Sequence, residues 1–190
     1  YAALDAITDA EANTAVGYQA LTASTASSNT AVGNTALAAN TTGTQNSAFG
    51  RGALDANTTG SYNMAYGSHA LGANTTASSN TAMGYQSLTS NTTGANNTAL
   101  GRASLYTNTT TSNNTALGFQ ALYTNAAANN SALGHNALFN NTTGASNTAV
   151  GKGAMENNTT ASDNTAMGLS ALNATTTGAN NTAVGSSALL

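Results

Sequence analysis

A short unit recurs along almost the whole chain, and it limits the possible fold more than any other feature. The unit reads Asn-Thr-Ala-apolar-Gly-x-x-Ala-Leu, followed by a polar stretch that is commonly Asn-Thr-Thr-Gly. About 17 residues separate successive copies of its glycine, a regular period typical of solenoids. Two of the steps, from Gly17 to Gly33 and from Gly118 to Gly134, are one residue shorter. We call these the corner glycines: Gly17, Gly33, Gly50, Gly67, Gly84, Gly101, Gly118, Gly134, Gly151, Gly168 and Gly185.

Each unit is too short for a pair of helices, because helix-pair repeats need roughly 33 residues or more. Its Gly, Asn, Thr and Ser residues also compete with helical hydrogen bonding. Extended at about 3.3 Å per residue, a unit gives a perimeter near 50 Å, which suits one narrow coil. The sequence therefore predicts an all-β parallel β-solenoid, or β-roll, of about eleven 17-residue coils stacked roughly 4.8 Å apart.

The repeat array fills residues 1–190 as a single domain and begins and ends in mid-repeat. Tyr1 to Leu4 match the end of a unit without its glycine, and Ser186 to Leu189 stop in the same phase. Solenoids need polar caps for solubility. We therefore expect a segment of a longer fibre whose ends are covered by further repeats or by other subunits.

Strand alternation separates an inner from an outer face within Thr-Ala-apolar-Gly. The Ala points to one face, and the Thr and the apolar residue point to the other. An invariant Ala fits a narrow interior, and the near-constant Leu four residues after each glycine is the main core side chain. The core prediction includes Ala15, Leu21, Ala31, Leu37, Ala48, Leu54, Ala99 and Leu105.

An Asn stands four residues before every corner glycine. Such a row is suited to a ladder in which side-chain amides stack from coil to coil. The predicted ladder includes Asn13, Asn29, Asn46, Asn63, Asn80 and Asn97. The glycine permits a sharp corner after the strand, and the Asn-Thr-Thr-Gly stretch predicts a polar loop with residues suited to positive φ.

The residue before each corner glycine varies widely in volume, which a tight interior would not tolerate. We therefore predict an interface between chains along this row, which includes Val16, Val32, Phe49, Tyr66, Met83 and Leu100. A thin rod with an exposed apolar row is expected to associate.

Asn-x-Ser/Thr sequons fall in the polar stretch of many repeats, where a loop could carry a glycan. They begin at Asn40, Asn57, Asn74, Asn91, Asn108, Asn141 and Asn158. These asparagines and the neighbouring Thr and Ser hydroxyls are therefore candidate glycosylation sites. The alternative is that the sequons are incidental in a chain so rich in Asn and Thr.

Side chains able to perform acid-base or metal chemistry are few and scattered. The chain has three Lys or Arg, six Asp or Glu and no Cys. The candidates are Asp5, Asp9, Glu11, Arg51, Asp55, His69, Arg102, His135, Lys152, Glu156 and Asp163. Most of the basic ones occupy variable positions next to a corner glycine, which indicates an exposed turn. Since no nucleophile, base and orienting group recur together, we expect no catalytic residue, no metal site, no cofactor and no enzyme activity.

Charge and hydropathy also bear on the partners. A net charge of -3 offers no basic patch for nucleic acid. No apolar run approaches the roughly 20 residues of a transmembrane helix, so we expect no membrane insertion of this segment.

The segments Asn13–Gly17, Asn29–Gly33, Asn147–Gly151 and Asn181–Gly185 resemble the repeats of YadA-like trimeric adhesin heads, and similar repeats are found in phage tail-fibre-like proteins. The resemblance covers nearly the whole chain. It implies a left-handed roll, usually trimeric, carried on a cell surface or a virion and used for attachment. The unit here is longer than the adhesin repeat, and its Asn-Thr-Thr-Gly loop is an addition.

The resulting hypothesis is a non-catalytic structural or adhesive component of an extracellular fibre. Its expected partner is itself, as a homotrimer or an end-to-end polymer, with a cell-surface receptor or glycan as a further partner. One alternative is an ice- or surface-binding solenoid, because a coil stack can align Thr14, Thr30, Thr81 and Thr98 in one rank. Another is a glycan-binding or glycan-coated rod, whose aromatic residues Tyr18, Tyr85, Tyr106, Phe119 and Tyr123 would stack on sugar rings.

Overall fold

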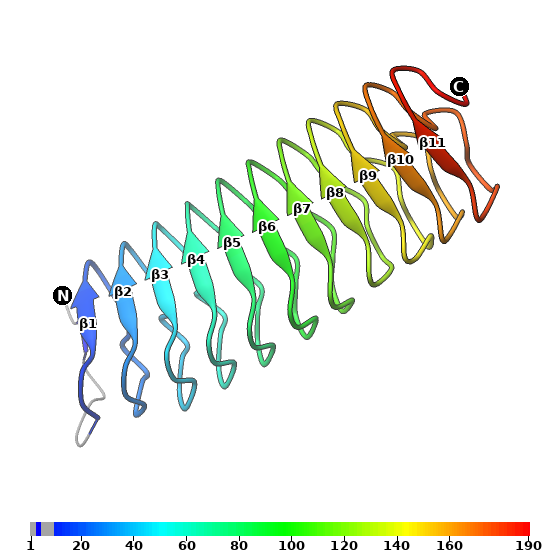
Figure 1. The fold of residues 1–190 in the computed structure, drawn as a ribbon. Coiled ribbons are helices and arrows are strands. Elements are labelled where there is room, and N and C mark those ends of the chain that lie inside the picture. The colour runs from blue at the N-terminus through cyan, green and yellow to red at the C-terminus, as the bar shows by residue number, and fades with distance from the viewer. Residues whose placement is uncertain (1–2, 5–9) are drawn as a thin grey trace.

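The chain winds into a stack of similar coils with one strand in each (Figure 1). A computed structural model describes residues 3–4 and 10–190. Tyr1, Asp5 and Asp9, which the sequence analysis singled out, lie outside the described residues. The described part confirms an all-β parallel β-solenoid with one coil for each sequence repeat.

Eleven short strands form one parallel sheet, and their order in the sheet is their order in the chain. They are β1 (Thr14–Val16), β2 (Thr30–Val32), β3 (Ser47–Phe49), β4 (Met64–Tyr66), β5 (Thr81–Met83), β6 (Thr98–Leu100), β7 (Thr115–Leu117), β8 (Ser131–Leu133), β9 (Thr148–Val150), β10 (Thr165–Met167) and β11 (Thr182–Val184). Each strand therefore pairs with the strands of the preceding and following coils.

Equivalent residues of neighbouring coils lie opposite each other throughout the sheet. Ala15 pairs with Ala31, and Ala99 pairs with Ala116. The two coils that are one residue short keep this register, as the pairing of Thr115 with Ser131 shows. Their missing residue falls in the polar loop, where Asn125 Nδ2 bonds to the carbonyl two residues ahead instead of three.

The interior of the stack is lined by Ala and Leu rows. Nearly all of the strand alanines are buried, with Ala15 of the first strand half-buried. Leu21, Leu37, Leu54 and Leu105 are 0% exposed. Each such Leu stabilises the coil by about 1.5–3 kcal/mol, and the small Ala opposite allows the coil walls to approach closely.

The corner glycines end the strands for a reason visible in the backbone. Gly101 has a φ of 129°, and a Cβ there would lie 2.5 Å from the carbonyl oxygen of Gly118 in the next coil. The same overlap recurs at the equivalent glycines from Gly17 to Gly168. Any larger residue would push neighbouring coils apart, which explains why the position never varies.

The core leucines adopt a left-handed backbone conformation, which the sequence analysis did not predict. The φ of Leu21, Leu88 and Leu138 lies between 50° and 54°. Each Leu N–H donates to a carbonyl of the next coil, as Leu88 does to Ser104 at 2.9 Å. Coil-to-coil hydrogen bonding thus continues past the corner through residues that are not in strand conformation.

The predicted positive φ in the Asn-Thr-Thr-Gly loop is wrong. Gly43 and Gly94 do not have positive φ, whereas the residue before the invariant Asn does, for example Tyr62 at 60° and Asn96 at 58°. A Cβ at Gly43 would lie 2.2 Å from the oxygen of Gly60, but this overlap does not require glycine at the position, since Ala77, Thr111 and Ala161 fill it in other coils.

The invariant asparagines, which we call the inner Asn row, bond mainly to the backbone. The Oδ1 of Asn80 accepts from the backbone N–H of Asn97 at 2.9 Å, and its Nδ2 donates to the carbonyl of Gly94 at 2.9 Å. The first of these two bonds recurs at every step of the row. The predicted amide-to-amide ladder is therefore mostly a side-chain-to-backbone ladder at these residues.

A second row of asparagines forms the amide ladder instead. We call it the loop Asn row: Asn40, Asn57, Asn74, Asn91, Asn108, Asn125, Asn141 and Asn158. Asn91 Nδ2 donates to Asn74 Oδ1 at 3.0 Å and to the carbonyl of Gly94 at 2.9 Å. Amide-to-amide bonds of 2.7–3.3 Å join the row from end to end. Both Asn rows therefore tie the loops to the stack.

Candidate binding surfaces

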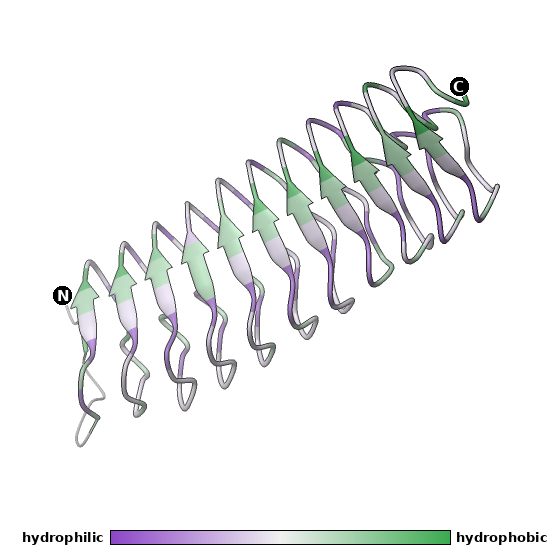
Figure 2. Cartoon of the chain, in the orientation of Figure 1, coloured by the Kyte–Doolittle hydropathy of each residue, from purple (hydrophilic) through white to green (hydrophobic). Residues whose placement is uncertain are grey.

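The outer face of the sheet carries an apolar stripe with no partner in the single chain. Its members are Val16, Val32, Phe49, Tyr66, Met83, Leu100, Leu117, Leu133, Val150, Met167 and Val184. Leu100 is 42% exposed and Leu133 is 48% exposed. Figure 2 shows most strands turning green toward the tip, so the stripe runs along most of the rod, and β4, which ends in Tyr66, is the exception. The predicted interface row lies here, and Val32, Phe49, Tyr66, Leu117 and Val150 are less exposed than the rest.

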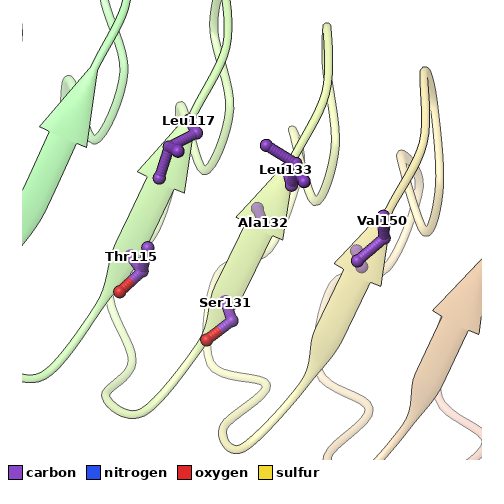
Figure 3. A pocket seen from close by; sticks show the side chains of 7 residues that line it. Thr115, Leu117, Ser131, Ala132, Leu133 and Val150 are labelled. Carbon is purple, nitrogen blue, oxygen red and sulfur yellow. The ribbon is translucent and has the colours of Figure 1, made fainter.

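The stripe contains one shallow apolar hollow over the middle of the sheet. It is lined by residues of β7, β8 and β9, among them Leu117, Leu133 and Val150. Figure 3 shows these three side chains on neighbouring strands, with the hydroxyls of Thr115 and Ser131 beside them. The hollow belongs to the open outer face, and Ala132 and Ala149 form its floor.

A row of strand hydroxyls runs beside the stripe, and it includes Thr14, Thr30, Thr81 and Thr98. Ser47 and Ser131 replace Thr in this row and keep its hydroxyl, and Met64 is the one strand position of the row without a hydroxyl. The neighbouring apolar side chains change in size from coil to coil. The hydroxyl row is nearly continuous, but its uneven apolar neighbours make this face less regular than the flat Thr rank of the ice-binding alternative.

Stacked aromatic rings form a ladder in the segment after the corner. Tyr106, Tyr123 and Phe139 lie in successive coils, with ring centroids 5.0 Å apart at both steps and ring planes within 8° of parallel. The rings cover one another's faces and leave mainly their edges to solvent. Tyr123 has a ring on each face, which blocks the stacking of sugar rings that the glycan-binding alternative requires, whereas Tyr106 has a ring on one face only.

A second ladder includes a cation and lies at the position directly after the corner glycine. The guanidinium carbon of Arg102 lies 6.0 Å from the ring centroid of Tyr85 and 5.5 Å from that of Phe119. Phe119 also stacks on His135 at 5.1 Å. Tyr18 occupies the equivalent position in the first complete coil and is 47% exposed.

The acidic side chains that follow the corner glycines, Asp55 and Glu156, lie in different coils. Partial burial raises the pKa of Asp55 above its usual 3.8, and the charge of His69 and nearby backbone N–H groups oppose that rise. Glu156 Oε1 accepts from Asn136 Nδ2 at 3.1 Å. Among the described residues, no three His, Cys, Asp or Glu side chains are grouped closely enough to hold a metal ion.

The glycosylation prediction for the sequon asparagines is wrong for the folded coil. Asn40, Asn57, Asn74, Asn91, Asn108, Asn141 and Asn158 are all 0% exposed, and each donates its amide N–H groups within the loop Asn row. A glycan on Nδ2 would remove one of these bonds and find no space. The recurrence of Asn at one fixed place in eight units, with Ser24 and Thr175 at that place in two others, was the signal of an interior position.

Three comparisons with known proteins place no relative beside this chain: no family model, no characterised protein and no solved structure matches it. In the described part of the chain, no helix is long and apolar enough to cross a membrane.

Proposed function

We propose that the chain is a structural and adhesive rod of an extracellular fibre, and that its apolar stripe binds further copies of the same chain. The supporting observation is the stripe itself, which runs along eleven consecutive strands with every member exposed or partly exposed. Exposed contiguous apolar surfaces of this extent mark interaction sites. A second copy presents the same periodic row, so two stripes can pair strand by strand.

Three chains packed stripe to stripe would bury this row at a common axis. The resemblance to trimeric adhesin heads favours that number, and export to a cell surface or a virion follows from the same resemblance. The rod has no need of catalysis in this role. In this role the rod carries a regular surface away from its attachment point, and the Asn and aromatic ladders between coils stiffen it.

The test is the mass of the particle in solution. We expect analytical ultracentrifugation of the wild-type chain to give a trimer, and the double variant Leu100→Gln/Leu133→Gln to give a monomer with an unchanged circular dichroism spectrum. Leu169→Gln is the matched control, since Leu169 is 51% exposed but lies outside the stripe. A compact wild-type monomer would refute self-association, and so would a double variant that still forms trimers.

A further inference from the structure

The chain has three Lys or Arg residues, and all three occupy the same position in the repeat. Arg51, Arg102 and Lys152 each directly follow a corner glycine, and they stand three coils apart. At about 4.8 Å per coil, their spacing along the rod is roughly 14 Å. A regular row of cations on an otherwise nearly uncharged rod is a distinct surface, which we call the cation row.

Arg102 differs from the two other cations in its electrostatic surroundings. Asp55 and Glu156 stand four residues after Arg51 and Lys152, in the same coils. No Asp or Glu occurs anywhere from residue 56 to residue 155. The nearest carboxylates are therefore about three coils, or roughly 14 Å, from Arg102 along the axis, which exceeds the Debye length of about 8 Å at physiological salt. Its positive charge is not cancelled.

The Arg102 side chain is also held in place. The rings of Tyr85 and Phe119 lie on either side of it in the neighbouring coils. Arg102 is exposed, and no ion pair or side-chain hydrogen bond is recorded for it among the described residues. The guanidinium thus presents its N–H groups in a fixed plane, the arrangement that binds a carboxylate with two parallel hydrogen bonds.

Neutral hydrogen-bonding groups adjoin Arg102 on both sides. Gln86 and Gln120 occupy the next position of the repeat in the preceding and following coils, and both are partly exposed. Their backbone N–H groups bond to carbonyls of the previous coil, at 3.0 Å for Gln86 and 3.1 Å for Gln120. Their side chains therefore stand at fixed intervals along the rod and can bond to hydroxyl groups.

From this arrangement we propose that Arg102, flanked by Tyr85, Gln86, Phe119 and Gln120, is a binding site for an acidic polysaccharide. The guanidinium binds a sugar carboxylate, and the amides and the Tyr85 phenol bind sugar hydroxyls. One coil rises by about the length of one sugar in an extended chain, so successive sugars meet successive coils. This proposal deepens the adhesive role by naming the class of ligand.

Nucleic acid fits the site poorly. A strand carries a phosphate about every 3.4 Å, whereas the cation row offers one charge in roughly 14 Å. The ring faces of Tyr85 and Phe119 that adjoin Arg102 are also turned toward its side chain, which leaves less of them for stacking bases. An acidic sugar chain needs only occasional ion pairs among many hydroxyl contacts.

Isothermal titration with polygalacturonate tests the proposal. We expect the wild-type chain to bind polygalacturonate, and its affinity to fall as the salt concentration rises. The same polymer with methyl-esterified carboxylates should not bind. Arg102→Gln should weaken binding about tenfold or more, since a hydrogen-bonded charge pair is lost. Arg102→Lys should fall between the two, because charge remains without the planar fork.

The matched controls are Arg51→Gln and Lys152→Gln, which remove equivalent charges in coils that also carry a carboxylate and should weaken binding less. No binding by the wild-type chain would overturn the site, and so would equal losses from all three variants or equal binding of the esterified polymer. Equal binding of poly-glutamate would show a general anion site and overturn the assignment to sugars. Ultracentrifugation of the same samples reports self-association separately, so failure of this site and failure of the fibre proposal are distinguishable.

Discussion

Individual side chains in this solenoid accept backbone conformations that they rarely adopt elsewhere. A left-handed backbone costs a residue such as Leu roughly 1–2 kcal/mol, yet Leu37, Leu71 and Leu122 all have φ near 50°. Burial of the same side chain stabilises the coil by about 1.5–3 kcal/mol. The two terms nearly balance, so the leucines alone cannot account for stability. The hydrogen bonds of the Asn rows are the other large contribution.

The loop Asn row leads to the first stability prediction. Asn91→Ala should lower the free energy of unfolding by about 2–3 kcal/mol, because Asn74 Oδ1, Asn108 Nδ2 and the Gly94 carbonyl each lose a buried partner. Urea denaturation followed by circular dichroism measures the loss.

Asn34→Ala is the matched control for this prediction. Asn34 is exposed, so the same substitution there should change stability by less than about 0.5 kcal/mol. Equal effects at Asn34 and Asn91 would show that the amide ladder adds nothing to stability.

Each coil is an element with one strand, one corner and one loop, and the corner is its least adaptable part. The glycine there needs both its φ and its missing side chain, since the carbonyl of the next coil occupies the space where a Cβ would be. The loop is more tolerant. The position of Gly43 in one coil is filled by Ala77, Thr111 or Ala161 in others.

Gly101→Ala tests the corner. It should destabilise the rod by about 3 kcal/mol, from backbone strain together with overlap against Gly118. Thermal unfolding of the purified variant measures the change. Gly178→Ala serves as the comparison, because a Cβ there would come no closer than 3.2 Å to another atom and φ is not positive. If both variants unfold alike, close approach of the coils is not what fixes the glycine.

The sequence was sufficient to predict the elements that depend on periodicity. Spacing and alternation placed Ala31 and Leu37 inside the stack and Val32 outside the sheet. The same reasoning failed at Asn40 and Asn57, because Asn beside Thr and Gly is typical of a surface loop even where the period shows an interior row. The left-handed φ of Leu37 could not be predicted from the sequence, since Leu has no preference for that conformation. The contacts around Arg102 required the positions of neighbouring coils.

At the scale of the whole molecule, the rod is a one-dimensional stack in which each coil contacts only its neighbours. Its stability should then grow with the number of coils. Equivalent residues of neighbouring coils pair with each other. The removal of one complete unit therefore brings together two coils whose surfaces are still complementary. The removal of half a unit joins surfaces that are not complementary.

Deletion of residues 85–101 tests this additivity. Gly84 would then precede Arg102 in the correct phase, and we expect a folded rod whose urea m-value falls by about a tenth, in proportion to the surface lost. Deletion of residues 85–92 alone breaks the phase and should abolish cooperative unfolding. A folded, cooperative product of the shorter deletion would contradict the one-coil register.

The two coils with one residue fewer keep the hydrogen bonds between coils although their loops are shorter. Asn125 reaches the carbonyl of Ala127 across the shortened loop, and the strands on both sides remain paired. In genetic terms, the stretch between the two Asn rows absorbs the loss of a codon, while the stretch from Gly118 to Leu122 does not. Replication slippage in so repetitive a gene is therefore tolerated at some points of every unit and not at others. Length variation among related genes should be confined to the points that tolerate it.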